Sequence, residues 1–375
     1  PFFFEIAMEP PSRQKLQSEE LQQALSSYCR RRRGAHQARG AQEARKWRPP
    51  RTHLHAELIR RRKDPQKSPK VEVEAALEAL QAGDQAAVEA LMRRDGEEPV
   101  PEEWQHRYRE GARAYWDQFY REKTLNFFKD RHYLREEFAE LMPAEVLADP
   151  KRWIDAIEAS PEGPPTSRET LLKAMEGRQV LLELGCAVGN GLIPMLRANP
   201  ELFGLACDLS AEAVRLLQSK DEYRSGRCLA FPCDITKAAS GQPSGEHVGL
   251  EDGVPEGSVD FATLLFVLSA IDPAQYVPTL SRIRRCMRPH MRPGGTVLVR
   301  DYGRGDLAQL RFGAGHWLGG DTYVRGDGTL AVFLTELGLS AAFEAAGFET
   351  LSCEYRRTEV VNRGTGVVMP RVWVQ

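Results

Sequence analysis

The chain has 375 residues, of which 42% are hydrophobic, so it can bury the core of one large domain with extensions. No uninterrupted apolar run approaches the roughly 20 residues of a membrane-spanning helix, and we therefore expect a soluble protein with no membrane partner. The formal net charge is only −2, yet residues 29–70 hold 15 Lys or Arg against three Asp or Glu. Seven cysteines without a C-x-x-C pair predict reduced core thiols and argue against a disulfide framework or a metal site.

Residues 1–100 are predicted to be a basic N-terminal extension, largely disordered or helical. Its two basic clusters, Arg30 to Arg33 and Arg60 to Lys63, leave three interpretations open: a solvated tail, a contact with a phosphate backbone, or an organelle-targeting segment. Because the cysteines indicate a reducing compartment, we expect a cytoplasmic protein. A mitochondrion or another organelle is the alternative, if the Arg-rich segment is a targeting signal. Between Val71 and Met92, apolar residues at helical spacing predict one or two amphipathic helices.

Aromatic residues recur at helical spacing from Trp104 to Tyr120 and predict one helix with an aromatic face. Immediately after it, a short segment combines paired rings with charges: Phe127, Phe128, Lys129, Asp130, Arg131 and His132. Aromatic rings interleaved with cations are suited to stacking an unpaired nucleobase. The alternative is that both rings belong to the core and the charges to a solvated turn.

A glycine-rich turn dominates the middle of the chain. The apolar run Val180 to Leu184 leads into Gly185, Gly189 and Gly191, and an apolar helix start follows, which predicts a buried strand, a tight turn and a helix. A second apolar strand ends at Asp208, where an acid can accept both hydroxyls of a ribose. The two strands together predict a site for a nucleoside cofactor.

The spacing of the glycines discriminates between nucleoside cofactors. The dinucleotide pattern G-x-G-x-x-G is broken at Ala187, which argues against a dehydrogenase. With Glu183 before the first glycine, the segment instead resembles the first motif of the Rossmann-like methyltransferases that use S-adenosylmethionine. An ordinary strand-to-helix turn remains the alternative for this motif alone.

Alternating strands and helices fill the rest of the chain. Asp301 and Tyr302 follow the predicted fifth strand and are expected on the same rim as Gly185, Asp208 and Asp234, because ligands bind beyond the carboxyl ends of parallel strands. The predicted elements after the second strand are strands 227–234, 258–268 and 296–300, helices 274–287 and 334–346, and closing strands 351–361 and 367–375, with a polar insertion at 238–256. This order predicts a Rossmann-like class I α/β fold with a mostly parallel seven-stranded sheet and a C-terminal antiparallel hairpin.

From about Glu103 to the C-terminus, roughly 270 residues, the chain carries a set of motifs in fixed order: Tyr115-Trp116-Asp-x-Phe119-Tyr120, Phe127-Phe-Lys-Asp-Arg-His132, Gly185-Cys-x-Val-Gly-Asn190, Ala206-Cys-Asp208, Phe266-Val-Leu-Ser-Ala270, Arg300-Asp-Tyr-Gly-Arg304, Tyr323-Val-Arg-Gly-Asp-Gly-Thr329, Val361-Asn-Arg-Gly364 and Arg371-Val-Trp373. This set resembles the tRNA 3-methylcytidine methyltransferases. Asp301-Tyr-Gly-Arg304 with Tyr323-Val-Arg-Gly-Asp327 is most similar to the branch acting on threonine and arginine tRNAs. The resemblance implies three regions: the extension 1–100, a helical cap 101–170 that contributes to cofactor and RNA binding, and a methyltransferase domain 171–375.

The resemblance also implies which residues bind S-adenosylmethionine. Asp208 is expected on the ribose, Asp234 on the adenine amine, and two apolar side chains on the adenine faces, with aromatic rings of the leading helix over the methionine portion. The matching positions are Trp116, Tyr120, Gly185, Asp208, Asp234, Ile235 and Leu265. The chain departs from the family at Ala187, where the family has glycine, and in the insertion between Asp234 and Val259.

The implied reaction is attack by cytosine N3 on the methyl carbon of S-adenosylmethionine, at position 32 of the anticodon loop. We expect Tyr302 to stack on the base and Asp301 to accept a hydrogen bond from the cytosine amine. The expected substrate-binding residues are Phe127, Phe128, Lys129, Arg131, His132, Arg300, Arg325 and Arg363.

Two other functions remain open: a methyltransferase of a protein or small molecule, and a noncatalytic RNA-binding adaptor with the same fold. The expected partners are tRNA, through its anticodon loop, and an aminoacyl-tRNA synthetase or another tRNA-delivering protein. Binding of S-adenosylhomocysteine would separate the methyltransferases from an adaptor without a cofactor.

Overall fold

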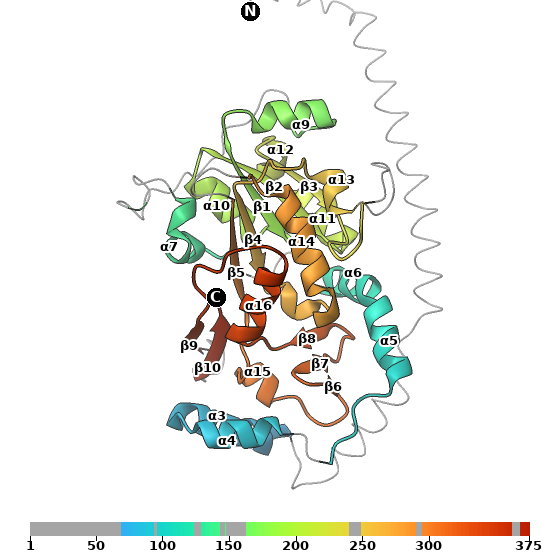
Figure 1. Cartoon of the computed structure of the whole chain (residues 1–375), viewed down its shortest axis with the longest axis vertical. Coiled ribbons are helices and arrows are strands. Elements are labelled where there is room, and N and C mark those ends of the chain that lie inside the picture. The colour runs from blue at the N-terminus through green and yellow to red at the C-terminus, as the bar shows by residue number, and fades with distance from the viewer. Residues whose placement is uncertain are drawn as a thin grey trace, which may run out of the picture. The chain divides into compact units, whose positions relative to one another are not determined.

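The computed structural model describes residues 69–93, 96–123, 129–142, 147, 163–239, 249–289, 295–361 and 368–375 (Figure 1). The chain divides into two units, Pro1–Arg60 and Arg61–Gln375, and the described residues belong to the second. The predictions for residues 1–68, for Phe127 and Phe128, for Arg363 and for the insertion at 240–248 lie outside the described residues.

A seven-stranded sheet in the order β3-β2-β1-β4-β5-β10-β9 forms the centre of the second unit. The strands are β1 (Gln179–Leu184), β2 (Leu202–Asp208), β3 (Cys228–Pro232), β4 (Phe261–Leu265), β5 (Thr296–Tyr302), β9 (Tyr355–Val361) and β10 (Val368–Val374). The first five are parallel, whereas β10 runs antiparallel to β5 and β9 antiparallel to β10. The predicted fold class is therefore confirmed, including its C-terminal hairpin.

The sheet is covered on both faces, which explains the unbroken apolar runs of its central strands. Leu182 packs in a cluster with α14 and α16, whereas its neighbour Leu181 packs in a second cluster with α10 and α11. The helices around the sheet are α7 (Leu134–Glu137), α9 (Arg168–Met175), α10 (Leu192–Ala198), α11 (Ala211–Gln218), α12 (Asp221–Arg224), α13 (Leu250–Gly253), α14 (Tyr276–Cys286) and α16 (Glu336–Ala345), with the 3-10 turns η3 (Ala139–Leu141), η4 (Leu268–Ala270) and η5 (Pro273–Gln275).

The aromatic segment 104–120 is two helices and not the single helix that was predicted. Helix α5 (Glu102–Glu110) ends at Gly111, and α6 (Ala112–Lys123) follows directly. A side chain at Gly111 would meet the ring of Tyr115 at 2.8 Å, so the close contact between the two helices requires glycine. The segment 71–92 also forms two helices, α3 (Pro69–Ala82) and α4 (Gln85–Met92), with Asp84 capping the second.

A small antiparallel sheet that was not predicted follows β5 and the short helix α15 (Leu307–Leu310). Its strands are β6 (Trp317–Gly319), β7 (Thr322–Val324) and β8 (Leu330–Val332).

The six cysteines within the described ranges are free thiols, five of them buried, as expected for core residues. A search of the described residues finds no helix with the length and apolarity needed to cross a membrane.

Candidate active site

A cavity lies at the carboxyl ends of β1 to β4 and collects most of the predicted cofactor-binding residues. Trp116, Tyr120, Gly185, Asp208, Asp234 and Ile235 all line it. Leu265 does not: it is buried in the core, close to Gly191, and its successors Phe266 and Val267 line the cavity in its place. Cys207, Cys233, Thr236 and Ala270 also line the cavity and were not predicted.

The glycine turn is shaped by contacts that exclude side chains. Gly185 has φ +66°, and a Cβ there would lie 2.4 Å from Cγ2 of Val267, while a Cβ at Gly191 would lie 2.1 Å from Oε1 of Glu183. Ala187 adopts φ 51°, a left-handed conformation that costs an alanine about 1 kcal/mol or more. Its N–H donates to Oδ2 of Asp208 at 2.8 Å, which ties the turn to the end of β2.

Asp208 is held in a fixed orientation at the cavity. Its Oδ1 accepts the N–H of Ser210 at 2.9 Å, and only 8% of the surface of Asp208 is exposed. Burial is the main reason that the pKa of Asp208 is raised to about 6; the hydrogen bonds from Ser210 and Ala187 oppose this shift, and the charge of Asp117 adds to it. Ser210 also caps α11, as its position in the sequence indicates. Two fixed carboxylate oxygens with spare lone pairs suit the vicinal hydroxyls of a ribose.

Helix α6 is attached to the same place by a residue that the sequence reasoning passed over. Asp117 accepts the hydroxyl of Ser210 at 2.6 Å, so the start of α11 fixes the helix that carries Trp116 and Tyr120. The rings of these two residues are stacked with centroids 6.1 Å apart, and burial raises the pKa of the Tyr120 hydroxyl well above its usual value. Helical spacing could have indicated Asp117, because it lies three residues before Tyr120 and therefore beside it on the helix surface.

Asp234 keeps one carboxylate oxygen without a partner among the described residues. Its Oδ1 accepts both the N–H of Thr236 at 3.0 Å and the Thr236 hydroxyl at 2.6 Å. The neighbouring Ile235 is buried and lines the cavity. An acceptor beside an apolar wall suits a flat base with an amino group, as the prediction for these two residues requires.

Glu183 places a buried carboxylate behind the glycine turn. Its Oε2 accepts the N–H of Leu192 at 2.8 Å, whereas Oε1 is buried and has no hydrogen-bond partner in the described part of the chain. Burial raises the pKa of Glu183 to about 7, and the guanidinium of Arg131, 4.0 Å from Oε1, opposes that shift. A buried, incompletely satisfied carboxylate favours a cation nearby. Glu183 does not itself line the cavity, so its charge can act on a ligand there only across the glycine turn.

The charged segment after Phe128 docks on the same turn. The N–H of Arg131 donates to the carbonyl of Asn190 at 2.8 Å, and the Asn190 side chain donates to Asp130 at 2.9 Å. The Arg131 guanidinium lies 5.6 Å from the ring centre of Phe266, within cation–π range. Lys129 and His132 are exposed. Arg131, one of the predicted substrate-binding residues, thus lies against the cofactor turn.

At the end of β5 two predictions need correction. Asp301 has no exposed surface, and its oxygens accept the N–H groups of Ser269 at 2.9 Å and Tyr302 at 2.8 Å. Its carboxylate is therefore not accessible to the amine of a cytosine. Burial raises the pKa of Asp301 to about 6. Arg300 is also buried and binds Gln375 and Glu137, both at 2.7 Å, which leaves no open guanidinium for a phosphate. The reason is that β5 continues to Tyr302 instead of ending at Arg300.

Tyr302 and Phe266 form an aromatic platform beside the cavity. Their ring centres are 5.2 Å apart, and Trp373 lies 5.9 Å from Phe266. Arg325 places its guanidinium 5.8 Å from the Tyr302 ring. Phe266 has φ 62°, which ends β4 three residues before the predicted limit and makes this ring line the cavity. No residue near Phe266 indicates that conformation, since Phe266 lies in an apolar run.

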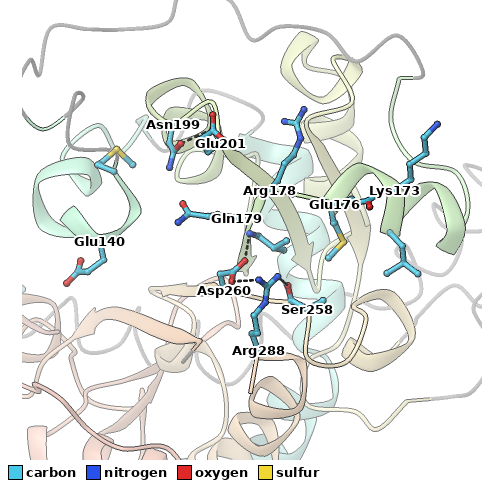
Figure 2. Close-up of a pocket in the computed structure, with 15 residues that line it drawn as sticks. Glu140, Lys173, Glu176, Arg178, Gln179, Asn199, Glu201, Ser258, Asp260 and Arg288 are labelled. Atoms are coloured by element: carbon cyan, nitrogen blue, oxygen red, sulfur yellow. Dashed lines mark hydrogen bonds and ion pairs between the residues drawn. The ribbon is translucent and has the colours of Figure 1, made fainter. Parts of the chain in front are cut away.

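A second, larger cavity of about 1020 Å³ lies at the amino ends of β1 and β4. Figure 2 shows it lined by side chains of both charges, with Asp260 bound to Arg288 at 3.1 Å and to the N–H of Val180 at 2.8 Å. None of the predicted site residues lines it. Because ligands of parallel sheets bind at the carboxyl ends of the strands, the cavity at Gly185 is the better candidate.

The strand order, the glycine turn and the acids that end β2 and follow β3 define a Rossmann-like methyltransferase. In agreement, a family model described as "Methyltransferase domain" matches residues 130–353.

Curated relatives give the family more closely. The chain is 38% identical over 286 residues to the tRNA N(3)-cytidine methyltransferase METTL2 of Danio rerio, covering 75% of this chain and 77% of that protein. It is 34% identical to METTL2B of Homo sapiens, covering 77% and 84%, and 37% identical to METTL6 of Mus musculus, covering 72% and 82%. The chain belongs to the tRNA N(3)-cytidine methyltransferase family.

Proposed function

We propose that this protein methylates N3 of a cytidine in tRNA, at position 32 of the anticodon loop, with S-adenosylmethionine as methyl donor. One observation carries the proposal beyond family membership. Phe266 belongs both to the nucleoside cavity and to the aromatic platform of Tyr302, so a base stacked on the platform lies beside the cofactor. Aromatic rings flanked by arginines are suited to stacking an unpaired base of a nucleic acid.

The chain's own residues hold the cofactor from several sides. Asp208 would bind the ribose hydroxyls, Asp234 the adenine amine, and Ile235 an adenine face, while Trp116 and Tyr120 would close over the methionine portion. When bound, S-adenosylmethionine supplies an activated methyl group on a sulfonium cation. The partly satisfied carboxylate of Glu183 favours that positive charge.

The chemistry asks the protein for positioning. N3 of neutral cytosine carries a free lone pair, so no strong general base is needed. The rate depends instead on holding N3 in line with the methyl group of the cofactor. N3 lies on the Watson–Crick edge, so the base has to leave its stack and enter the site unpaired. Tyr302 stacks on it with Phe266 at its edge, since the two rings are tilted by 53°, and Arg131 and Arg325 place positive charge beside these rings.

Asp301 acquires a different role from the one first expected. Since its oxygens hold the N–H groups of Ser269 and Tyr302, it joins the turn after β4 to the end of β5. It therefore fixes the platform on which the base stacks and acts as a positioning residue. Phe127, Phe128, Lys129, His132 and Arg363 stay predicted RNA contacts.

The test is to incubate the purified chain with S-adenosylmethionine and tRNA from cells that lack 3-methylcytidine, and to analyse the digested nucleosides by mass spectrometry. We expect new 3-methylcytidine with the wild type and none with Asp208→Ala. Asp221→Ala is the matched control, since the Asp221 side chain is exposed at the surface of α12. Cofactor binding without any 3-methylcytidine would contradict the proposed substrate, and absence of cofactor binding would favour an adaptor.

A further inference from the structure

The hairpin of α3 and α4 packs against the chain that leaves β5 (Figure 1). Ala76, Ala79, Val88 and Met92 are buried together with Leu307 and Leu310 of α15. The hairpin precedes residue 130, where the match to the methyltransferase family model begins. The hairpin, which lies outside the residues matched by the family model, thus shares a hydrophobic core with α15, the short helix that follows Arg304.

A single guanidinium joins three distant segments at this contact. Arg304 donates to both carboxylate oxygens of Glu89 on α4, at 2.7 and 3.1 Å, and lies 3.2 Å from the carboxylate of Asp321 in the turn between β6 and β7. The hydrogen bond from Arg304 lowers the pKa of Glu89, which keeps the carboxylate charged. Two parallel bonds fix the guanidinium in angle as well as position.

Hydrogen bonds of Gly303, Arg304 and Asp321 connect this contact to the platform. The N–H of Arg304 donates to the carbonyl of Leu334 at 2.8 Å, and that of Gly303 to Val372 at 2.9 Å. Asp321 accepts from Gln309 at 2.8 Å, and its carbonyl accepts the N–H of Phe333, whose ring lies 5.8 Å from Tyr302. A shift of Arg304 would therefore move Tyr302 and its ring neighbours together.

We propose that Glu89 is a positioning residue for methyl transfer: through Arg304 and Asp321 it fixes the Tyr302 platform relative to the cofactor cavity. The inference rests on the proposed function. The side chains of Glu89 and Arg304 are 38% and 34% exposed, and ion pairs of that exposure add little to folding stability. Their contribution is to geometry, where a small displacement of a reacting group lowers the rate steeply.

The test compares Glu89→Ala and Glu89→Gln with Glu78→Ala, a matched control on the exposed face of α3 in the same hairpin. We expect kcat on tRNA to fall about tenfold in Glu89→Ala and less in Glu89→Gln, which keeps the shape and one acceptor. The KM for S-adenosylmethionine and the affinity for S-adenosylhomocysteine should change less than twofold, and Glu78→Ala should match the wild type. A purely structural role would lower the melting temperature and the cofactor affinity together.

Hydrogen exchange measured by mass spectrometry supplies a readout that needs no activity. Amides of residues 301–310 should exchange at least threefold faster in Glu89→Ala, while those of residues 179–208 should not change. Equal exchange at 301–310 in Glu89→Ala and Glu78→Ala, or an unchanged kcat, overturns the inference. If the wild type itself forms no 3-methylcytidine, the proposed function fails, and the exchange experiment still decides whether Glu89 braces this segment.

Discussion

The cofactor cavity and the aromatic platform lie side by side but are built in different ways. The cavity is formed mostly by residues at or directly after the ends of β1, β2 and β3, and its buried carboxylate, that of Asp208, is held by backbone N–H donors. The platform combines rings from the turn after β4 and from β5 and β10 with arginines that come from other segments. A site for a small, constant ligand can be encoded locally, whereas a site for a base within a large RNA is assembled from the tertiary fold.

The sharpest separation of the two regions should come from Asp208→Asn. The change removes the charge and half of the acceptor capacity of a buried side chain that holds two backbone N–H groups. We expect affinity for S-adenosylhomocysteine, measured by calorimetry, to fall at least about 100-fold, equivalent to about 3 kcal/mol. Affinity for tRNA should stay within twofold. An equal loss of both affinities would show that the two regions are not separable.

The opposite separation is expected for Tyr302→Ala. Removal of a ring that stacks on a base costs about 1–3 kcal/mol, so kcat/KM for tRNA should fall about 5- to 150-fold. Tyr302→Phe is the matched control, because it keeps the ring and should retain most of the activity. Affinity for S-adenosylhomocysteine should change less than threefold in both variants. A loss confined to cofactor affinity would assign Tyr302 to the other region.

The pH dependence of cofactor binding reports on the buried acids. Burial raises the pKa of Glu183 to about 7 and that of Asp208 to about 6, so both groups hold their protons more tightly in the folded protein than in the unfolded chain. The corresponding stability is complete below about pH 4, the region of the unfolded pKa values, and is lost as the pH rises through 6 and 7. A cationic ligand prefers the charged carboxylates, so its affinity should rise over the same interval.

Comparison of two ligands isolates this effect. From pH 6 to pH 8, affinity for S-adenosylmethionine should rise about fivefold more than affinity for S-adenosylhomocysteine, which lacks the sulfonium charge. In Glu183→Gln the difference between the two pH profiles, measured by calorimetry, should shrink to the part that Asp208 contributes. Parallel profiles already in the wild type would remove Glu183 from the account of charge recognition.

The smallest effect is expected for Ala187→Gly. Because Ala187 has φ 51°, glycine should relieve about 1 kcal/mol of strain and raise the melting temperature by about 2 °C. Ala342→Gly in α16 is the control, since the same exchange inside a helix should lower stability by a similar amount. Thermal unfolding followed by circular dichroism measures both. A lower melting temperature in Ala187→Gly would mean that the alanine methyl group makes contacts that outweigh the strain.

Much of the fold and of the cofactor site follows from the sequence alone. The apolar runs of β1 and β2 identify buried parallel strands, and the glycines between Gly185 and Gly191 mark a turn that side chains would block. Ser210, directly before α11, predicts the N-terminal cap of that helix. These features depend on backbone angles, periodicity and hydrogen bonds between near neighbours, which a short stretch of sequence specifies by itself.

Only the tertiary structure decided the substrate side. β10 pairs with Asp301 and Tyr302 and thereby extends β5, which buries Asp301 and Arg300 against the prediction. Phe266 turns to the cavity through a left-handed backbone, and Arg304 meets Glu89 across more than 200 residues. Each outcome depends on partners far away in the chain, and burial and ion pairing with such partners leave no periodic trace in the local sequence.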